Sequence, residues 1–494
     1  MTLLADDQLH RAAGVLLTMA AGDALGAGYE FSGPYPQSMQ VQMKGGGAFG
    51  WAPGEWTDDT QMALVIAAAA NQGADLREAE VLDSVAAGWV DWLTQATDVG
   101  AQTRSVLAAV ARRDRVTADA LLEESARLHA RSGHTAGNGS LMRTAPVALA
   151  HLRDPSAITE AATTLSRLTH YDPEAAEACV LWCHLIRHAV LTGELDPAPG
   201  LQELSIDASE VWARRLEDAS HMVPADFSSN GWVVEALQAA WCAIVTTGDP
   251  ADGDATHVRR ALEAAVRGGR DTDTVAAIAG GLLGGLYGAS AVPAAWRRVL
   301  HGWPGLRARD LISLAVLLST GGMGDASGWP LEAAVDYRGY SGRHALAVHP
   351  HDDGVLLGGI GQLNPLPASV DAVVSLCRLG AEQVPAAGVA PEDHVEVWLV
   401  DSSRRVANPN LQFVLADTAE VLADLRAEGK TVLLHCVQAQ SRTPTVAAMY
   451  AVGLGIPGEQ ALADVCSALP HAQPNPAFKA ALQGLGSGQS PHSD

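Results

Sequence analysis

The chain has 494 residues, and its 32 Lys and Arg against 56 Asp and Glu give a formal net charge of −24. This length is too great for one ordinary hydrophobic core and allows two or three domains. With 48% hydrophobic and 18% charged residues, the composition is typical of a soluble globular protein and excludes a disordered or fibrous one. The acidic charge has the wrong sign for binding nucleic-acid phosphates, so no nucleic-acid partner is expected.

The N-terminal segment contains Asp6 and Asp7 and no basic region before its first apolar stretch. It does not resemble a secretory signal, and we expect a cytoplasmic protein. The uncharged run 274–296 is long enough to raise the question of a membrane span, but it is rich in Gly and Ala and contains Pro293. We interpret it as a tightly packed helix followed by a turn, and we expect no membrane partner.

Residues 7–320 are predicted to be mostly helical, because long Ala, Leu and Val stretches alternate there with turns rich in Gly, Pro and Asp. The clearest helices are predicted over 62–70, 78–92, 175–191 and 231–247. The stretch 320–340 is rich in Gly, Ser and Pro and marks a candidate domain boundary.

Two segments, GEWTDDTQMALV and GGRDTDTVAAIA, each place carboxylates and hydroxyls at the start of an apolar helix. Helix capping explains either segment alone, but it explains the pair less well. Adjacent acids repel each other, and a hard divalent cation bound through oxygen ligands can compensate them. Two Mg²⁺ ions would nearly neutralise these carboxylates, orient a diol and activate water. The five candidate carboxylates are Glu30, Asp58, Asp59, Asp271 and Asp273.

Six motifs follow one another in the region 10–320: GDALGAGYEF, TDDTQMAL, TDVGAQTRSVL, AGNGSLMRTAPVAL, THYDPEAAEA and DTDTVAAIAGGLLGGLYG. In this order they resemble the ADP-ribosylglycohydrolase family, which includes the enzyme that removes ADP-ribose from dinitrogenase reductase. The resemblance implies an all-helical fold, two Mg²⁺ ions with Mn²⁺ as the alternative, and hydrolysis of an N- or O-glycosidic ADP-ribosyl bond. The implied substrate is an ADP-ribosylated protein or another ADP-ribose conjugate. The implied metal residues are Glu30, Thr57, Asp58, Asp59, Asp271, Asp273 and Thr274.

The same resemblance places Asp98 beside the reacting ribose as a catalytic residue. It also implies a binding loop near the diphosphate or ribose, where bare backbone amides can approach phosphate closely. The residues of that loop are Gly137, Asn138, Gly139 and Ser140. Plainer alternatives stay open, since Asp98 could shape a turn and Asn138 could hold a left-handed one. His170 could contact substrate or be a core histidine, and Arg270 could bind a phosphate or weaken the acidic field.

Beyond residue 350 the sequence pattern changes to short apolar runs that alternate with helical segments. This pattern predicts an α/β sheet. Strands are predicted over 354–360, 371–377, 394–400 and 430–436, and helices over 412–428 and 443–453. We therefore expect a helical domain at 1–322, a linker at 323–349, an α/β domain at 350–488 and a disordered tail at 489–494. Residues 345–494 are expected to fold independently.

The segment KTVLLHCVQAQSRTPTV reads as strand, loop and helix, with five residues between Cys436 and Arg442. A loop of backbone amides at a helix N-terminus can cradle a phosphoryl group and favour a thiolate, while a guanidinium holds two of the phosphoryl oxygens. Cys436 is therefore the candidate nucleophile, and Arg442 is the candidate phosphate-binding residue.

This segment resembles the HCxxxxxR signature of tyrosine and dual-specificity phosphatases, and the resemblance extends weakly over 350–488. It implies Asp401 as the general acid, while Ser441 assists departure of the thiolate and Thr443 contacts the cysteine. Ala439 departs from the signature, which usually has Gly there, and would be strained at a positive φ. The substrate would be a phosphoprotein or a small phosphate ester.

The expected fold class is multidomain: an all-α ADP-ribosylglycohydrolase-like domain followed by an α/β cysteine-phosphatase-like domain. The expected function is a metal-dependent hydrolase of ADP-ribosyl bonds with a second, cysteine-dependent phosphatase-like site. The alternative is a metal-binding or structural relative without hydrolase activity, carrying a pseudo-phosphatase domain that reads phosphate.

Overall fold

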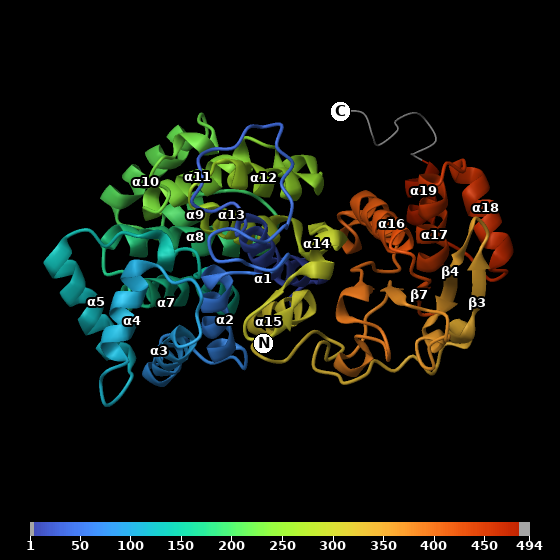
Figure 1. Cartoon of the computed structure of the whole chain (residues 1–494), viewed down its shortest axis with the longest axis horizontal. Coiled ribbons are helices and arrows are strands. Elements are labelled where there is room, and N and C mark those ends of the chain that lie inside the picture. Colours follow the sequence, from blue (N-terminus) through green and yellow to red (C-terminus); the bar gives the residue numbers. More distant parts are fainter. Residues whose placement is uncertain (1–3, 484–494) are drawn as a thin grey trace. The chain divides into compact units, whose positions relative to one another are not determined.

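The computed structural model describes residues 4–483, so the tail expected at 489–494 lies outside the described residues. The chain divides into two compact units (Figure 1). The first unit comprises Met1–Val292 and Val299–Ser327, and the second comprises Pro293–Arg298 and Gly328–Asp494. A short segment of the helical region therefore belongs to the second unit by its packing.

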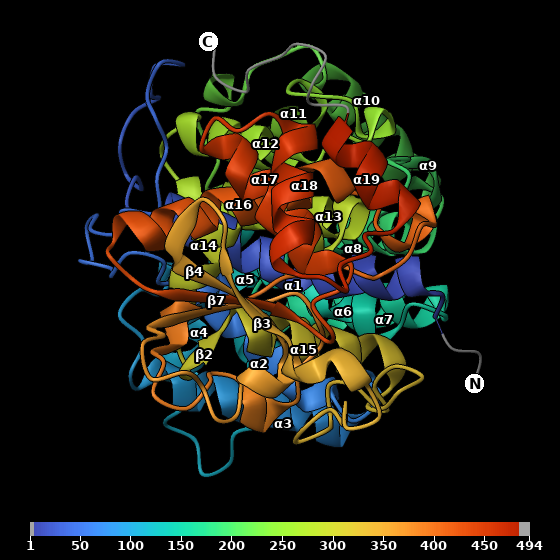
Figure 2. The ribbon, with the colours of Figure 1, turned by 90° about the vertical axis from the view of Figure 1, so that its right-hand side faces the viewer.

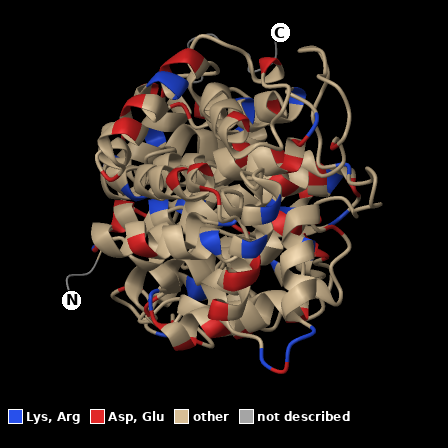
Figure 3. Ribbon diagram, turned by 90° about the vertical axis from the view of Figure 1, so that its left-hand side faces the viewer, with Lys and Arg blue, Asp and Glu red and all other residues tan. Residues whose placement is uncertain are grey.

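The first unit is helical, as predicted (Figures 1 and 3). Its helices are α1 (Asp6–Gly26), α2 (Asp58–Ala70), α3 (Ala79–Leu93), α4 (Ala101–Val110), α5 (Ala118–Ser132), α6 (Ala145–Ala150), α7 (Pro155–Arg167), α8 (Pro173–Thr192), α9 (Ala198–Leu201), α10 (Ile206–Ala219), α11 (Val233–Val245), α12 (Thr256–Arg267), α13 (Thr272–Tyr287) and α15 (Ala308–Thr320). Two short strands, β1 (His301–Gly302) and β2 (Leu306–Arg307), pair in an antiparallel ribbon. In Figure 3 acidic and basic residues are interspersed along the helices, so the negative charge is not confined to one element.

Helices α1 and α13 pack with their backbones in close approach. A Cβ atom at Gly22 would overlap the carbonyl oxygen of Ala276, and one at Gly26 would overlap the backbone of Asp273. Glycine is therefore required at these contacts, which bring the end of α1 against the start of α13. All of α13 is buried, which confirms the interpretation of this region as a packed helix. Among the described residues, no helix is long and apolar enough to cross a membrane.

The second unit is built around a five-stranded sheet in the order β3-β4-β7-β5-β6. Strands β3, β4 and β7 are labelled in Figure 2. Only the β3–β4 pair is antiparallel, and the other pairs are parallel. The strands are β3 (Leu346–His349), β4 (Asp352–Gly359), β5 (Ala372–Ser375), β6 (His394–Glu396) and β7 (Val432–Cys436). The helices are α14 (Ala294–Val299), α16 (Leu411–Ala427), α17 (Arg442–Gly453), α18 (Gly458–Ala468) and α19 (Pro476–Gln483). This architecture confirms the predicted α/β class.

The strand predicted over 394–400 is too long, because β6 ends at Glu396. The side chain of Asn408 forms hydrogen bonds with both backbone groups of Val400. Its Oδ1 accepts from the Val400 amide at 2.9 Å, and its Nδ2 donates to the Val400 carbonyl at 2.8 Å. These bonds replace strand pairing with a loop, which carries Asp401.

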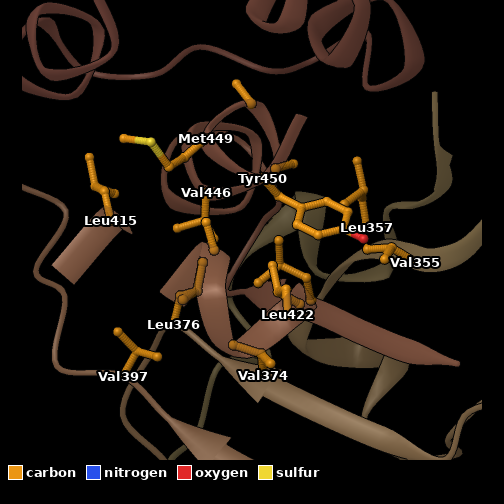
Figure 4. Packing of buried hydrophobic residues seen from close by; sticks show 14 of the residues in the cluster. Val355, Leu357, Val374, Leu376, Val397, Leu415, Leu422, Val446, Met449 and Tyr450 are labelled. Carbon is orange, nitrogen blue, oxygen red and sulfur yellow. The ribbon is translucent and has the colours of Figure 1, made fainter. Parts of the chain in front are cut away.

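The sheet of the second unit has a hydrophobic core on each face. Val374 and Leu422 lie in one core (Figure 4), whereas Val373 and Leu433 lie in the other. Burial on both faces explains why the parallel strands read as continuous apolar runs. Ala294 of α14 is buried in the first of these cores.

The segment expected as a linker at 323–349 is largely part of the second unit, which begins at Gly328. Trp329 is buried there, and its ring packs edge-on against Trp398 with the ring centroids 5.8 Å apart. Strand β3 also lies within this segment.

Candidate functional site

Carboxylates from three parts of the first unit converge at the starts of α2 and α13. The carboxylate oxygens of Asp23, Asp59 and Asp273 lie within 4.8 Å of one another, as do those of Glu30, Asp271 and Asp273. The two groups share Asp273, which is in the first turn of α13. The two acidic segments, more than 200 residues apart in the sequence, therefore meet.

These acids are held at a high electrostatic cost. Burial, followed by repulsion from Asp271 and other acids, raises the pKa of Glu30 to about 9. Burial and neighbouring carboxylates hold the pKa values of Asp58, Asp59 and Asp273 well above their ordinary range. Glu30 Oε2 and Asp59 Oδ1 are buried and have no hydrogen-bond partner within residues 4–483. Repelling carboxylates with unpartnered oxygens fit a divalent cation.

Asp23, which was not among the predicted site residues, is fully buried in α1. Its Oδ1 accepts from the Thr57 amide and lies 2.8 Å from the Thr57 hydroxyl, while its Oδ2 accepts from the Thr60 amide at 3.0 Å and hydroxyl at 2.6 Å. The Thr57 hydroxyl also lies 3.0 Å from Asp59 Oδ2. Burial raises the pKa of Asp23 to about 6 against these hydrogen bonds, which lower it. Asp23 orients the turn that presents the acids of α2, and the available signal was an acid within an apolar helix.

A cavity of about 450 Å³ opens over these acids. The predicted residues among its lining are Glu30, Asp58, Asp98, Gly137, Asn138, Gly139, His170, Asp271, Asp273 and Thr274. Burial, together with repulsion from Asp271, raises the pKa of Asp98 to about 6. Asp98 is therefore a carboxyl group of the cavity lining whose pKa is raised.

The glycine-rich loop is tied to the acidic group through Asn138. Its Nδ2 donates to Asp271 Oδ2 at 2.7 Å and to the Asn230 carbonyl at 2.9 Å. Asn138 begins a short 3-10 helix, so it does not hold the left-handed turn considered above. Asn230, also missed, is buried and donates to the Gly269 carbonyl at 3.0 Å. Ser140 is buried behind the loop, with its hydroxyl 3.0 Å from that of Ser166.

His170 and Arg270 differ in their relation to the cavity. His170 lines it and is held through Nδ1, 2.7 Å from the Thr169 hydroxyl. Burial and the nearby Arg143 lower the pKa of His170 to about 3, so its imidazole is neutral. Arg270 is not among the lining residues, and its Nη1 donates to the carbonyls of Ala225 and Gly268, each at 3.3 Å.

The cysteine loop of the second unit connects β7 to α17. Cys436 ends β7 and is buried, and Arg442 begins α17. Between them Ala439 has a φ of 55° and is buried. Ala439 therefore has the positive φ at which strain was predicted, because residues other than glycine rarely adopt this conformation.

Arg442 and Asp401 face each other beside this loop. Arg442 Nη1 donates to the Leu376 carbonyl at 2.6 Å, whereas its buried Nε has no hydrogen-bond partner in the described chain and lies 4.0 Å from Asp401 Oδ2. Asp401 Oδ1 accepts from the Ser441 hydroxyl at 2.7 Å and from Asn475 Nδ2 at 3.1 Å. The sequence analysis missed Asn475, which lies far from the motif and carried no local signal.

His435, next to the cysteine, is a structural residue. Its Nε2 lies 2.7 Å from the Ser375 hydroxyl, and burial lowers its pKa to about 4. The hydroxyl of Thr443 lies 3.5 Å from the Gly358 carbonyl.

The first unit is thus a helical domain whose cavity is lined by clustered carboxylates. Residues 4–322 match the ADP-ribosylglycohydrolase family, and the chain belongs to that family. By class it is therefore a hydrolase of ADP-ribosyl bonds.

Two relatives and one solved structure are similar to parts of this chain. "ADP-ribosylarginine hydrolase Tri1" of Pseudomonas putida is 32% identical over 307 residues, covering 60% of this chain and 75% of the relative. "ADP-ribosyl-[dinitrogen reductase] glycohydrolase" of Rhodospirillum rubrum is 28% identical, and the match covers 58% of this chain and 88% of the relative. The structure of human DUSP28 covers 28% of this chain and 90% of its own, with 23% identity and a TM-score of 0.24. The predicted resemblance to the ADP-ribosylglycohydrolase family is confirmed.

Proposed function

We propose that the first unit is a metal-dependent hydrolase that releases ADP-ribose from arginine-linked conjugates. The observation that carries the proposal is the pair of carboxylate groups sharing Asp273 beneath the cavity. The residues that would hold two Mg²⁺ ions are Glu30, Thr57, Asp58, Asp59, Asp271, Asp273 and Thr274. Such ions, when bound, polarise substrate oxygens and favour ionisation of water. The arginine linkage is suggested by the name of the Pseudomonas putida relative.

Residues of the chain would position the nucleotide and move a proton. Asp98, which lines the cavity, would take a proton from the water that attacks the anomeric carbon, while the carbon–nitrogen bond breaks and the guanidine leaves. The backbone amides of the glycine-rich loop would approach the diphosphate, and the neutral His170 would donate or accept a hydrogen bond at the ribose.

A second cavity of about 550 Å³ extends the path for the nucleotide. It shares Gln102, Gly137 and Gly231 with the acidic cavity and is also lined by the partly exposed Trp232. An indole offers a flat apolar surface for a base. The adenosine end of ADP-ribose would therefore lie beside Trp232, with the diphosphate at the shared glycines.

The test measures free ADP-ribose released from arginine- and serine-linked substrates, with Mg²⁺, Mn²⁺ or chelator. Asp58→Asn and Asp271→Asn should abolish release while the protein stays folded, because each removes a ligand and relieves repulsion. The control is Asp91→Asn, an exposed acid on α3. Full activity in chelator, or in both variants, would contradict the metal-dependent mechanism. ADP-ribose binding without release would favour the non-catalytic alternative.

A second proposed activity is hydrolysis of a small phosphate ester or phosphoprotein at Cys436. Two observations support it. Nε of Arg442 has no hydrogen-bond partner among the described residues, and it lies 4.0 Å from Oδ2 of Asp401. The thiolate would attack phosphorus, and Asp401 would protonate the leaving oxygen.

This activity is tested on the full chain with an aryl phosphate and no added metal. Cys436→Ser should remove turnover and keep vanadate binding, with Cys377→Ser as the control buried cysteine. Asp401→Asn should slow hydrolysis most for poor leaving groups. Vanadate binding without turnover in the wild-type protein would favour a phosphate reader, and no oxyanion binding would refute the assignment.

A further inference from the structure

Two aromatic side chains stand at the mouth of the acidic cavity. Phe31 is 65% exposed and Phe49 is 37% exposed, and both line the cavity together with Glu30 and Asp58. Their ring centroids are 6.1 Å apart at an interplanar angle of 65°. Single exposed apolar residues are ordinary, but these two rings pack together in the lining of a cavity that is also lined by carboxylates.

The backbone at Phe31 is held in an unfavourable conformation. Its φ is 62°, in the left-handed region that bulky residues rarely adopt. A pair of hydrogen bonds with Arg270, whose φ is 65°, fixes it: the Phe31 amide donates to the Arg270 carbonyl at 2.7 Å, and the Arg270 amide donates to the Ser32 carbonyl at 2.6 Å. Strain of this kind persists where the surrounding structure enforces it, often at functional sites. Here it places the Phe31 ring next to Glu30.

The cavities show which end of the substrate meets these rings. The second cavity, proposed above for adenosine, joins the acidic cavity through Gln102, Gly137 and Gly231, and neither phenylalanine lines it. With the ribose over the acids and the nucleotide running toward Trp232, the group on the far side of the anomeric carbon is the leaving group. Phe31 and Phe49 are then the aromatic residues that it meets.

We propose that Phe31 and Phe49 bind the guanidinium of an arginine leaving group and so determine the preference for arginine-linked over serine-linked ADP-ribose. A planar guanidinium stacks on aromatic faces and is attracted by their π electrons. A serine oxygen offers neither charge nor a plane. The inference rests on the proposed hydrolase function and names its specificity residues.

The test uses the full chain with Mg²⁺ and compares Phe31→Leu and Phe49→Leu with Phe31→Tyr. Leucine keeps an apolar side chain without the π face, whereas tyrosine keeps both. Each leucine variant should raise KM for arginine-linked substrate about tenfold, within the range of cation–π contacts, and leave KM for serine-linked substrate unchanged. Phe31→Tyr, which keeps the π face, should raise KM for arginine-linked substrate much less than Phe31→Leu does. Calorimetric affinity for ADP-ribose alone should not change.

A matching loss of ADP-ribose affinity in the leucine variants would overturn the inference, because the rings would then bind the nucleotide. Unchanged KM for arginine-linked substrate, with normal wild-type turnover, would overturn it as well. Failure of the proposed function is distinguishable, since the wild-type protein would then release no ADP-ribose from either substrate.

Discussion

Replacing Asp23 by Asn tests how the fold prepares the acidic site. Asp23 accepts hydrogen bonds from both the amide and the hydroxyl of Thr57 and of Thr60. The amide side chain of Asn keeps one oxygen and turns an NH₂ toward the other pair. A threonine hydroxyl can rotate and accept from it, but one buried backbone N–H loses its acceptor.

A buried N–H without an acceptor lowers the free energy of unfolding by about 1–3 kcal/mol. Removing the Asp23 charge also relieves its repulsion of Asp58, Asp59 and Asp273, whose pKa values it helps to raise. In metal-free protein these two effects oppose each other, so we expect little change in Tm. With cations bound there is no repulsion left to relieve, and Mg²⁺ affinity should fall about 10- to 100-fold, the usual cost of removing a residue that orients metal ligands.

The assay is thermal unfolding of the full chain across a Mg²⁺ titration, alongside ADP-ribose release. Asp6→Asn, at the exposed start of the same helix, is the matched control and should match wild type. Wild-type Mg²⁺ affinity in Asp23→Asn would refute the reasoning and leave Asp23 as a core residue only. A large loss of stability without metal would refute the proposed cancellation.

In chelator the free energy of unfolding should fall as pH rises from about 5 to about 9. The carboxyl groups of Asp98 and Glu30 have pKa values raised to about 6 and about 9 in the folded protein, so the folded state binds more protons than the unfolded state over this range. Mg²⁺ should flatten this dependence of Tm on pH. Ala439→Gly should stabilise the second unit by up to ~1 kcal/mol in denaturant unfolding by removing left-handed strain, and should speed aryl phosphate turnover; lower stability would contradict this account. Asp417→Ala should lower the free energy of unfolding of the second unit by about 1–3 kcal/mol and increase its proteolysis. The reason is that Asp417 accepts hydrogen bonds from the Ala294 amide at 2.9 and 3.0 Å. Asp424→Ala, on the exposed side of α16, should have neither effect. A fragment 345–494 should be less stable than the same unit in the full chain, because it lacks α14 and Trp329.

The local features of both sites were predictable because their chemistry lies within a few residues of sequence. Thr57 and the acids after it precede an apolar helix, and the start of α13 repeats the arrangement, so caps and ligand candidates could be read together. The spacing of Cys436 and Arg442 between a strand and a helix likewise predicted the loop, and the departure at Ala439 pointed to its positive φ.

Tertiary packing alone decided which distant residues complete these sites. Glycines let α1 and α13 approach closely, which brings α1 beside Asp273. The partners of Asp23 at the start of α2, Thr57 and Thr60, lie 34 and 37 residues along the chain. Asn475 reaches Asp401 across a separation of 74 residues. Sequence patterns report local backbone preference and which face is apolar, whereas contacts of this kind depend on how closely whole elements pack. Ala294 shows the same division, since its helix is readable locally but only packing places it in the core of the second unit.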